Sequence, residues 1–128
     1  MNMKKTILIT KAVSDGNRVR VLMALMHQKE LCACHIIELL RISAPTVSRH
    51  MGLLQTAGLV TSRKDSRWVY YRLADETREP AMLPLINWLA DSLATDPVIL
   101  QDRIALEHIA DCDTEQKNCK HYKNNQTH

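Results

Sequence analysis

The stretch from residue 43 to residue 73, SAPTVSRHMGLLQTAGLVTSRKDSRWVYYRL, decides the fold. Its first half has the periodicity of an amphipathic helix over residues 44–57. The inward positions of this helix are Val47, Met51 and Leu54. Ser43 is suited to the N-cap, proline is tolerated in the first turn, and Gly58 is suited to a left-handed C-cap. The outward side of the predicted helix is short, polar and basic.

The second half, LVTSRKDSRWVYYRL, predicts a β-hairpin. β-Branched and aromatic residues fill two short runs, about 59–64 and 68–73, and polar residues 65–67 form the turn between them. The segment from Arg41 to Arg72 contains six basic residues and one acid, a net charge of +5, whereas the rest of the chain carries −2. Local positive charge of this kind suits phosphate contacts, although an ordinary solvated face would also explain the charge alone.

Apolar residues recur at helical spacing on both sides of this stretch, and they predict further helices. These cover about residues 3–13, 17–26 and 98–110, a segment that ends at Leu40, and a segment that begins between Pro80 and Pro84. We expect one folded domain, residues 1–110, and a flexible cysteine-containing tail, residues 111–128. The sequence has no apolar run of about 18 residues and no signal-peptide pattern, which favours a cytoplasmic protein with no membrane partner.

A helix, a short polar break, a capped helix and a basic hairpin follow one another without interruption. This order predicts a winged helix-turn-helix, mainly α with a small β-hairpin, rather than a surface helix beside an incidental hairpin. In that fold the second helix lies in the major groove of double-stranded DNA. Arg49 is the best candidate for a base contact, because a guanidinium can bind both guanine acceptors. The expected DNA-contacting residues are Ser43, Thr46, Ser48, Arg49 and His50 on the helix, and Arg63, Lys64 and Arg67, assigned to phosphates, on the hairpin.

Two cysteines, Cys32 and Cys34, open the preceding helix in the stretch ELCACHIIELL, residues 30–40. In a protein without a secretion signal, thiols serve as metal ligands or redox sensors more often than as a disulfide framework. Residues two apart on a regular helix point about 200° from each other. The two sulfurs can therefore converge on one soft ion only if the first turn is frayed or if Cys32 lies before the helix.

Residues 30–73 resemble the ArsR/SmtB family of metal- and metalloid-responsive repressors. The family pattern runs ELCVCDL, then a helix with S-x-H-L-x-x-L, then G-L-V and a wing that ends W-x-x-Y-x-L, and the resemblance covers about residues 12–95. It implies a winged-helix homodimer whose interface is formed by the first helix and the helix near residues 80–94. It also implies that the dimer represses its own operon from an imperfect inverted repeat and that ligand binding releases the DNA.

The chain departs from the arsenic-sensing pattern of the family at two positions. Ile37 stands where some members have a third cysteine, and His35 replaces the usual aspartate. Cys32 and Cys34 can therefore supply two ligands, and a third must come from water, an exogenous thiol or elsewhere in the chain. His35 itself is either a ligand or a residue that supports the site. The candidate ligands in the tail are Cys112 and Cys119, with His121 close behind.

The ligand set favours As(III) or Sb(III) as inducer, with no organic cofactor. Arsenite is satisfied by two thiolates and a hydroxide, whereas zinc and cadmium usually need four ligands. The zinc site that many family members build on the C-terminal dimer helix is absent, because residues 81–94 contain no histidine. A redox-sensing repressor and a repressor that senses cadmium, lead or zinc are alternatives with the same fold.

A thiol enzyme is a further alternative, in which Cys32 or Cys34 would act as the nucleophile. The sequence has no glycine-rich anion loop, no C-x-x-C motif and no evident catalytic acid-base pair. We therefore expect no enzymatic activity.

Overall fold

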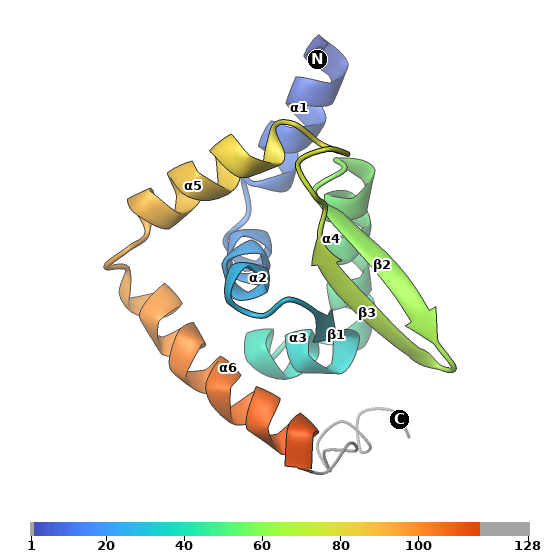
Figure 1. The fold of residues 1–128 in the computed structure, drawn as a ribbon, viewed down its shortest axis with the longest axis vertical. Helices are drawn as coiled ribbons and strands as arrows, with labels where there is room; N and C mark the ends of the chain where they lie inside the picture. The colour runs from blue at the N-terminus through green and yellow to red at the C-terminus, as the bar shows by residue number, and fades with distance from the viewer. Residues whose placement is uncertain (1, 116–128) are drawn as a thin grey trace.

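The computed structural model describes residues 2–115, and it describes side chains as far as Ile109. This part of the chain contains six helices and three strands (Figure 1). In chain order they are α1 (Met3–Ala12), α2 (Gly16–His27), β1 (Leu31–Cys32), α3 (Ala33–Leu40), α4 (Ala44–Thr56), β2 (Val60–Asp65), β3 (Trp68–Leu73), α5 (Met82–Ser92) and α6 (Pro97–Glu115). No helix in the described range is long and apolar enough to span a bilayer.

Helix α2 lies at the centre of the fold, between α5 and α6 on one side and α4 and β3 on the other (Figure 1). Its N-cap is Asp15, whose carboxylate accepts from the backbone N–H groups of Asn17 and Arg18 at 2.8 and 3.2 Å. Residues 21–25 are all buried, because neighbouring elements cover this helix on most sides. The core therefore forms around α2, and α3, α4 and the sheet pack outward from it.

The predicted hairpin forms as β2 and β3, joined by the two-residue turn of Ser66 and Arg67. Ser66 has a φ of 59°, as a tight hairpin turn requires. A third strand that the sequence analysis missed, β1, pairs antiparallel with β3, so that the order in the sheet is β1-β3-β2. A two-residue strand carries no alternation of apolar and polar residues, and it forms here because β3 offers it an open edge.

The predicted bounds of α4, its glycine C-cap and the predicted start of α5 are confirmed, whereas the predicted end of α6 is wrong. Helix α4 has the expected bounds to within one residue, Gly58 has a φ of 79°, and α5 begins between the two prolines. Helix α6 continues to Glu115 rather than ending near Ala110, since the sequence ADCDTE contains no glycine or proline to stop it. Cys112 consequently lies on a helix. The division into a domain and a flexible tail stays a prediction, and Cys119 and His121 lie outside the described residues.

Candidate nucleic-acid interface and candidate metal centre

Helix α4 has the two faces that the sequence predicts. Its inward side chains are buried with at most 1% of their surface exposed: Val47, Met51 and Leu54. On the outward side, Pro45, Ser48 and Arg49 are exposed, and Thr46 is half-buried. Among the described residues, Arg49 makes no hydrogen bond or ion pair, so its guanidinium is available to a partner. The exposed side of α4 is therefore short, polar and basic.

The turn between α3 and α4 sets the angle of α4. Arg41 ends α3 in the left-handed conformation, with a φ of 56°, and its N–H donates to the carbonyl of Ile37 at 2.8 Å. Ser43 then caps α4, because its Oγ accepts from the N–H of Thr46 at 3.4 Å and lies 2.8 Å from the Thr46 hydroxyl. These two expected DNA contacts thus also fix the start of the helix.

His50 is held by a residue that the sequence analysis did not single out. The guanidinium of Arg18, on α2, donates to Nδ1 of His50 at 2.9 Å and to the carbonyls of Ala12 and Lys11 at 2.8 and 3.2 Å. Since a guanidinium has only donors, Nδ1 of His50 must be the acceptor. His50 therefore joins α4 to the junction of α1 and α2, and no local sequence signal marks this contact.

The basic residues of the hairpin are not equivalent. Arg63 donates from Nε and NH2 to the two carboxylate oxygens of Glu30, at 2.7 Å each. These bonds hold the pKa of Glu30 below its ordinary value. Lys64 and Arg67 lie exposed near the tip, where the guanidinium of Arg67 is 5.2 Å from the centre of the Trp68 ring. Arg63, Lys64 and Arg67 are the wing residues expected at phosphates. Within the described residues, Arg63 is the one of these three that forms an ion pair with a carboxylate at less than 3 Å.

Cys32 and Cys34 are both buried, with 2% and 5% of their surfaces exposed, and they form a small apolar cluster with Trp68 and Tyr70. Cys32 ends β1 in an extended conformation and occupies the N-cap of α3, while Cys34 lies in the first turn. This is one of the two arrangements in which the sulfurs of such a pair can face one ion. The structure therefore brings the two predicted ligands together at the junction of strand and helix.

His35 supports this junction. Its Nδ1 accepts a hydrogen bond of 3.1 Å from the backbone N–H of Cys32, and the ring is buried. The histidine thus closes the first turn of α3 as the N3 residue of a capping box does. This contact favours the supporting role for His35, because a neutral ring whose Nδ1 accepts carries its proton on Nε2, which leaves neither nitrogen a lone pair for a metal ion.

Within the described side chains, no group of three or more histidine, cysteine or acidic residues is placed to hold a metal ion. The described side chains of one chain therefore supply no third donor to the cysteine pair. Helix α6, which carries Cys112, packs against α3, the helix that begins at the cysteine pair (Figure 1). The side chain of Cys112 lies outside the described range.

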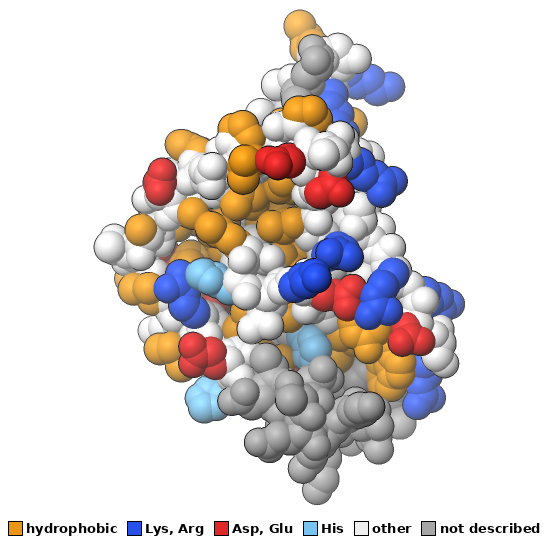
Figure 2. All heavy atoms as spheres, viewed as in Figure 1, with side chains coloured by type: hydrophobic (Ala, Val, Ile, Leu, Met, Phe, Trp, Pro, Cys, Tyr) orange, Lys and Arg blue, Asp and Glu red, His pale blue; other side chains and the backbone are white. Residues whose placement is uncertain are grey.

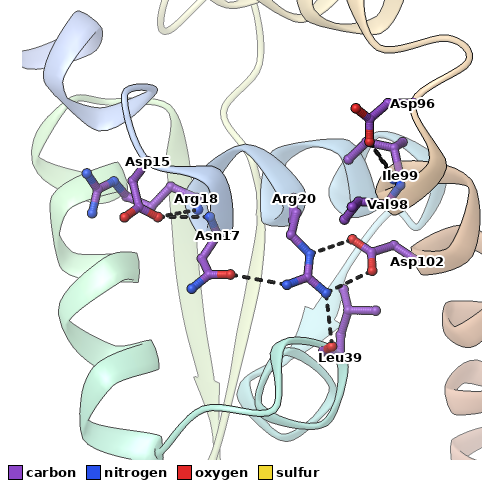
Figure 3. Close-up of polar contacts among 9 residues, drawn as sticks. All are labelled: Asp15, Asn17, Arg18, Arg20, Leu39, Asp96, Val98, Ile99 and Asp102. Carbon is purple, nitrogen blue, oxygen red and sulfur yellow. Dashed lines mark hydrogen bonds and ion pairs between the residues drawn. The ribbon is translucent and has the colours of Figure 1, made fainter.

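Arg20 connects α6 to the helix-turn-helix (Figure 3). Its guanidinium binds both carboxylate oxygens of Asp102 at 2.8 Å, and it also donates to Oδ1 of Asn17 at 3.2 Å and to the carbonyl of Leu39 at 3.3 Å. Leu39 lies in the last turn of α3. One side chain of α2 thus fixes α6 and the end of α3 together.

Large apolar side chains remain exposed on five helices of the single chain within the described residues. They are Met3 and Ile7 on α1, Met26 on α2, Leu53 on α4, Leu83 and Trp88 on α5, and Val98, Leu100 and Ile104 on α6. Figure 2 shows hydrophobic side chains gathered over the α5 side of the face in view. Exposed apolar patches mark protein interfaces, and α1 and α5 are the helices expected to form one.

Comparison with known proteins gives a family and several relatives. The model of the arsR family of bacterial regulatory proteins matches residues 15–62. The arsenic resistance transcriptional regulator ArsR2 of Pseudomonas putida is 34% identical over 91 residues, which cover 66% of this chain and 79% of that protein. The cadmium resistance transcriptional regulatory protein CadC of Listeria innocua is 43% identical over 61 residues, 48% of this chain and 51% of CadC. The chain spans about half the length of several curated relatives that it matches.

A solved structure has the same fold. Fragment 1–100 of Mb0332 from Mycobacterium bovis, described as a homodimeric winged helix-turn-helix DNA-binding domain, superposes with a TM-score of 0.57 and 26% identity over 70% of this chain and 81% of that one. The predicted winged helix-turn-helix is therefore confirmed.

Proposed function

The chain belongs to the arsR family of bacterial regulatory proteins, and on this basis we propose that it is a DNA-binding repressor of a metalloid-resistance operon. Trivalent arsenic or antimony, bound by Cys32 and Cys34, releases it from its operator. The observation that carries this proposal is the burial of the two cysteines at the start of α3, the helix directly before α4.

DNA is bound through the exposed side of α4. Arg49 reads a guanine edge in the major groove, because its guanidinium is exposed and engaged by no described residue. Ser43, Thr46 and Ser48 contact base edges or phosphates at the start of the same helix. On the wing, Lys64 and Arg67 neutralise phosphates, since both lie exposed near the tip.

The protein acts as a homodimer on an inverted repeat. The exposed apolar residues of α1 and α5, among them Ile7, Leu83 and Trp88, are the surface that a second copy covers. A two-fold dimer presents two copies of α4 to half-sites about one helical turn of DNA apart, so its operator has matching two-fold symmetry.

The inducer is a soft trivalent ion because both described donors are sulfurs. Each thiol replaces one hydroxide of arsenious acid, so that one S–As bond forms and one water leaves per thiol, while arsenic stays trivalent. The third coordination position is filled by Cys112 or Cys119. This assignment is supported by the packing of α6 on α3 and by the lack of a third donor among the described side chains.

Three titrations test the proposal against its alternatives. A DNA duplex selected by the protein from a random pool is bound first, and arsenite, cadmium chloride or hydrogen peroxide is then added to separate reduced samples. We expect arsenite to release the DNA at concentrations at which the other two do not. Release by peroxide alone would make the protein a redox sensor, release by cadmium alone would make it a cadmium sensor, and no selected DNA would remove the repressor function.

A further inference from the structure

A row of three side chains crosses the sheet from the cysteine pair to the wing. Cys32 of β1 lies opposite Tyr70 of β3, and Tyr70 lies opposite Arg63 of β2. Side chains that are directly opposite on neighbouring strands point to the same face of a sheet. Leu31 and Tyr71, one position along, are buried in the main core, so the row lies on the other face of the sheet.

Glu30 connects the two ends of this row, because it lies close to Cys32 in the sequence and its carboxylate binds Arg63. Glu30 directly precedes β1 and lies two residues before Cys32. Its carboxylate receives both hydrogen bonds of Arg63, and the Arg63 guanidinium lies 4.4 Å from the centre of the Tyr70 ring. We call Glu30, Arg63 and Tyr70 the wing clasp. It joins the segment that carries the cysteines to the middle of β2.

The opposite face of β2 is tied to α4. Gln55, near the end of α4, donates from Nε2 to the hydroxyl of Ser62 at 2.9 Å. Since Ser62 and Arg63 are neighbours in an extended strand, they point to opposite faces of the sheet. The wing is thus held between the DNA-reading helix on one face and the cysteine segment on the other.

From this arrangement we propose that Glu30 is a positioning residue for the wing, and that the cysteine pair controls DNA binding through the wing clasp. The proposal rests on the proposed function, and it names the path by which ligand binding reaches DNA. Arg63 then serves to orient the wing rather than to neutralise a phosphate. Lys64 and Arg67 touch the DNA only while the clasp holds the wing in place.

The backbone at Cys32 explains why the ligand acts on the clasp. This residue is both the N-cap of α3 and the residue of β1 that faces Tyr70. A ligand that draws the sulfurs of Cys32 and Cys34 onto one atom changes the torsion angles of Cys32, since the two cysteines belong to different elements. The change alters the pairing with Tyr70 and the position of Glu30, and Arg63 loses its partner.

Glutamine substitutions show whether Arg63 positions the wing or binds a phosphate, because the two roles predict opposite changes in DNA affinity for Glu30→Gln. If the clasp positions the wing, Glu30→Gln and Arg63→Gln each weaken DNA binding by about two- to fivefold, and the double variant is no weaker than either alone. If Arg63 instead contacts a phosphate, Glu30→Gln strengthens binding, because a competing carboxylate is lost, and Arg63→Gln lowers the salt dependence by about one phosphate contact. The second pattern would overturn the proposal.

Glu38→Gln is the matched control. It makes the same change of charge on α3, and within the described residues the Glu38 side chain forms no hydrogen bond or ion pair with the wing. We expect it to leave DNA binding unchanged. A loss equal to that of Glu30→Gln would show that any carboxylate in this region has the same effect, and it would contradict a specific clasp.

Hydrogen exchange tests the path without DNA. Arsenite is expected to raise the exchange rates of amides in residues 60–73 of the wild-type protein, and Glu30→Gln to raise them without arsenite. If arsenite binds and releases DNA but the wing amides keep their rates, the clasp is not the path and the proposed function stands. If arsenite neither binds nor releases DNA from the wild-type protein, the proposed function fails first.

Discussion

The Arg20 guanidinium on α2 donates two hydrogen bonds of 2.8 Å to the carboxylate of Asp102 on α6, across 82 residues of sequence. The pair is mostly buried, with 23% and 13% of the two side chains exposed. The same guanidinium reaches the carbonyl of Leu39 at the end of α3. Helix α6 is therefore fixed to the helix-turn-helix by a charged contact as well as by the burial of Leu106 and Ile109.

Removal of one partner from this pair should destabilise the fold. Asp102→Ala leaves a largely buried guanidinium without its carboxylate, and we expect the free energy of unfolding to fall by about 1–3 kcal/mol. Urea denaturation measures the change. Glu107→Ala is the matched control, because Glu107 is exposed on the same helix and its side chain forms no hydrogen bond or ion pair with the described residues. Equal losses in the two variants would show that the ion pair contributes little.

The helix-turn-helix and the wing could be predicted from sequence because their signals are local. Ser43, Gly58 and the two prolines near α5 mark boundaries within a few residues of the feature that they control. The run of β-branched and aromatic residues at 68–71 likewise predicts a strand without knowledge of the rest of the chain. Local rules therefore suffice for the helix-turn-helix and the wing.

The contacts that join these elements could not be predicted, because they depend on tertiary position. Glu30 and Arg63 are 33 residues apart in the sequence, and no pattern in the residues around either one indicates that they form a pair. Strand β1 has two residues and forms only against β3. The cysteine pair was found from its chemistry, but its place between a strand and a helix follows from that unpredicted pairing.

Substitution of Arg49 tests the assignment of the base contact. Arg49→Ala should weaken binding to the selected DNA by about 1–3 kcal/mol, as expected for loss of a bidentate contact to guanine. Arg49→Lys keeps the charge but not the planar pair of donors, so it should lose much of the discrimination between the selected DNA and random DNA. Competition binding measures both quantities. Full discrimination by the lysine variant would reassign Arg49 to a phosphate.

Substitution of the cysteines separates induction from DNA binding. Both thiols are buried, so alanine is preferable to serine, whose hydroxyl would need a hydrogen-bond partner. We expect Cys32→Ala with Cys34→Ala to bind the selected DNA within about threefold of wild type, since both thiols are buried beside Trp68 and Tyr70 and belong to β1 and α3 rather than to α4, and to lose release by arsenite. Loss of DNA binding in this variant would mean that the thiols are needed for the fold.

Substitution of Cys112 and Cys119 tests the third donor. Arsenic X-ray absorption of the intact protein should show three sulfur neighbours, and the variant Cys112→Ala with Cys119→Ala should show two. This pair of substitutions is preferable to truncation after Ala110, because truncation there would cut through α6. Three sulfurs in the variant would exclude the tail as the source, and two in the wild-type protein would leave the position to hydroxide.

Acid should weaken the contact between α2 and α6 through His27. Arg103 donates to Nε2 of His27 at 2.9 Å, which requires an unprotonated nitrogen. Burial first, and then the charge of Arg103, lower the pKa of His27 from its ordinary value of 6.5. With this lowered pKa, the unfolded chain binds more protons than the folded one. The contribution of His27 to the free energy of unfolding is therefore complete above about pH 6.5, and it declines as the pH falls from there toward the folded pKa.

We expect the urea unfolding free energy of wild type, relative to that of His27→Gln, to fall between pH 7.5 and 5.5. The reason is that glutamine offers Arg103 an acceptor that does not titrate. Arg103→Gln removes only the second cause and should retain part of the decline. A constant difference between wild type and His27→Gln across this range would show that His27 does not couple stability to pH.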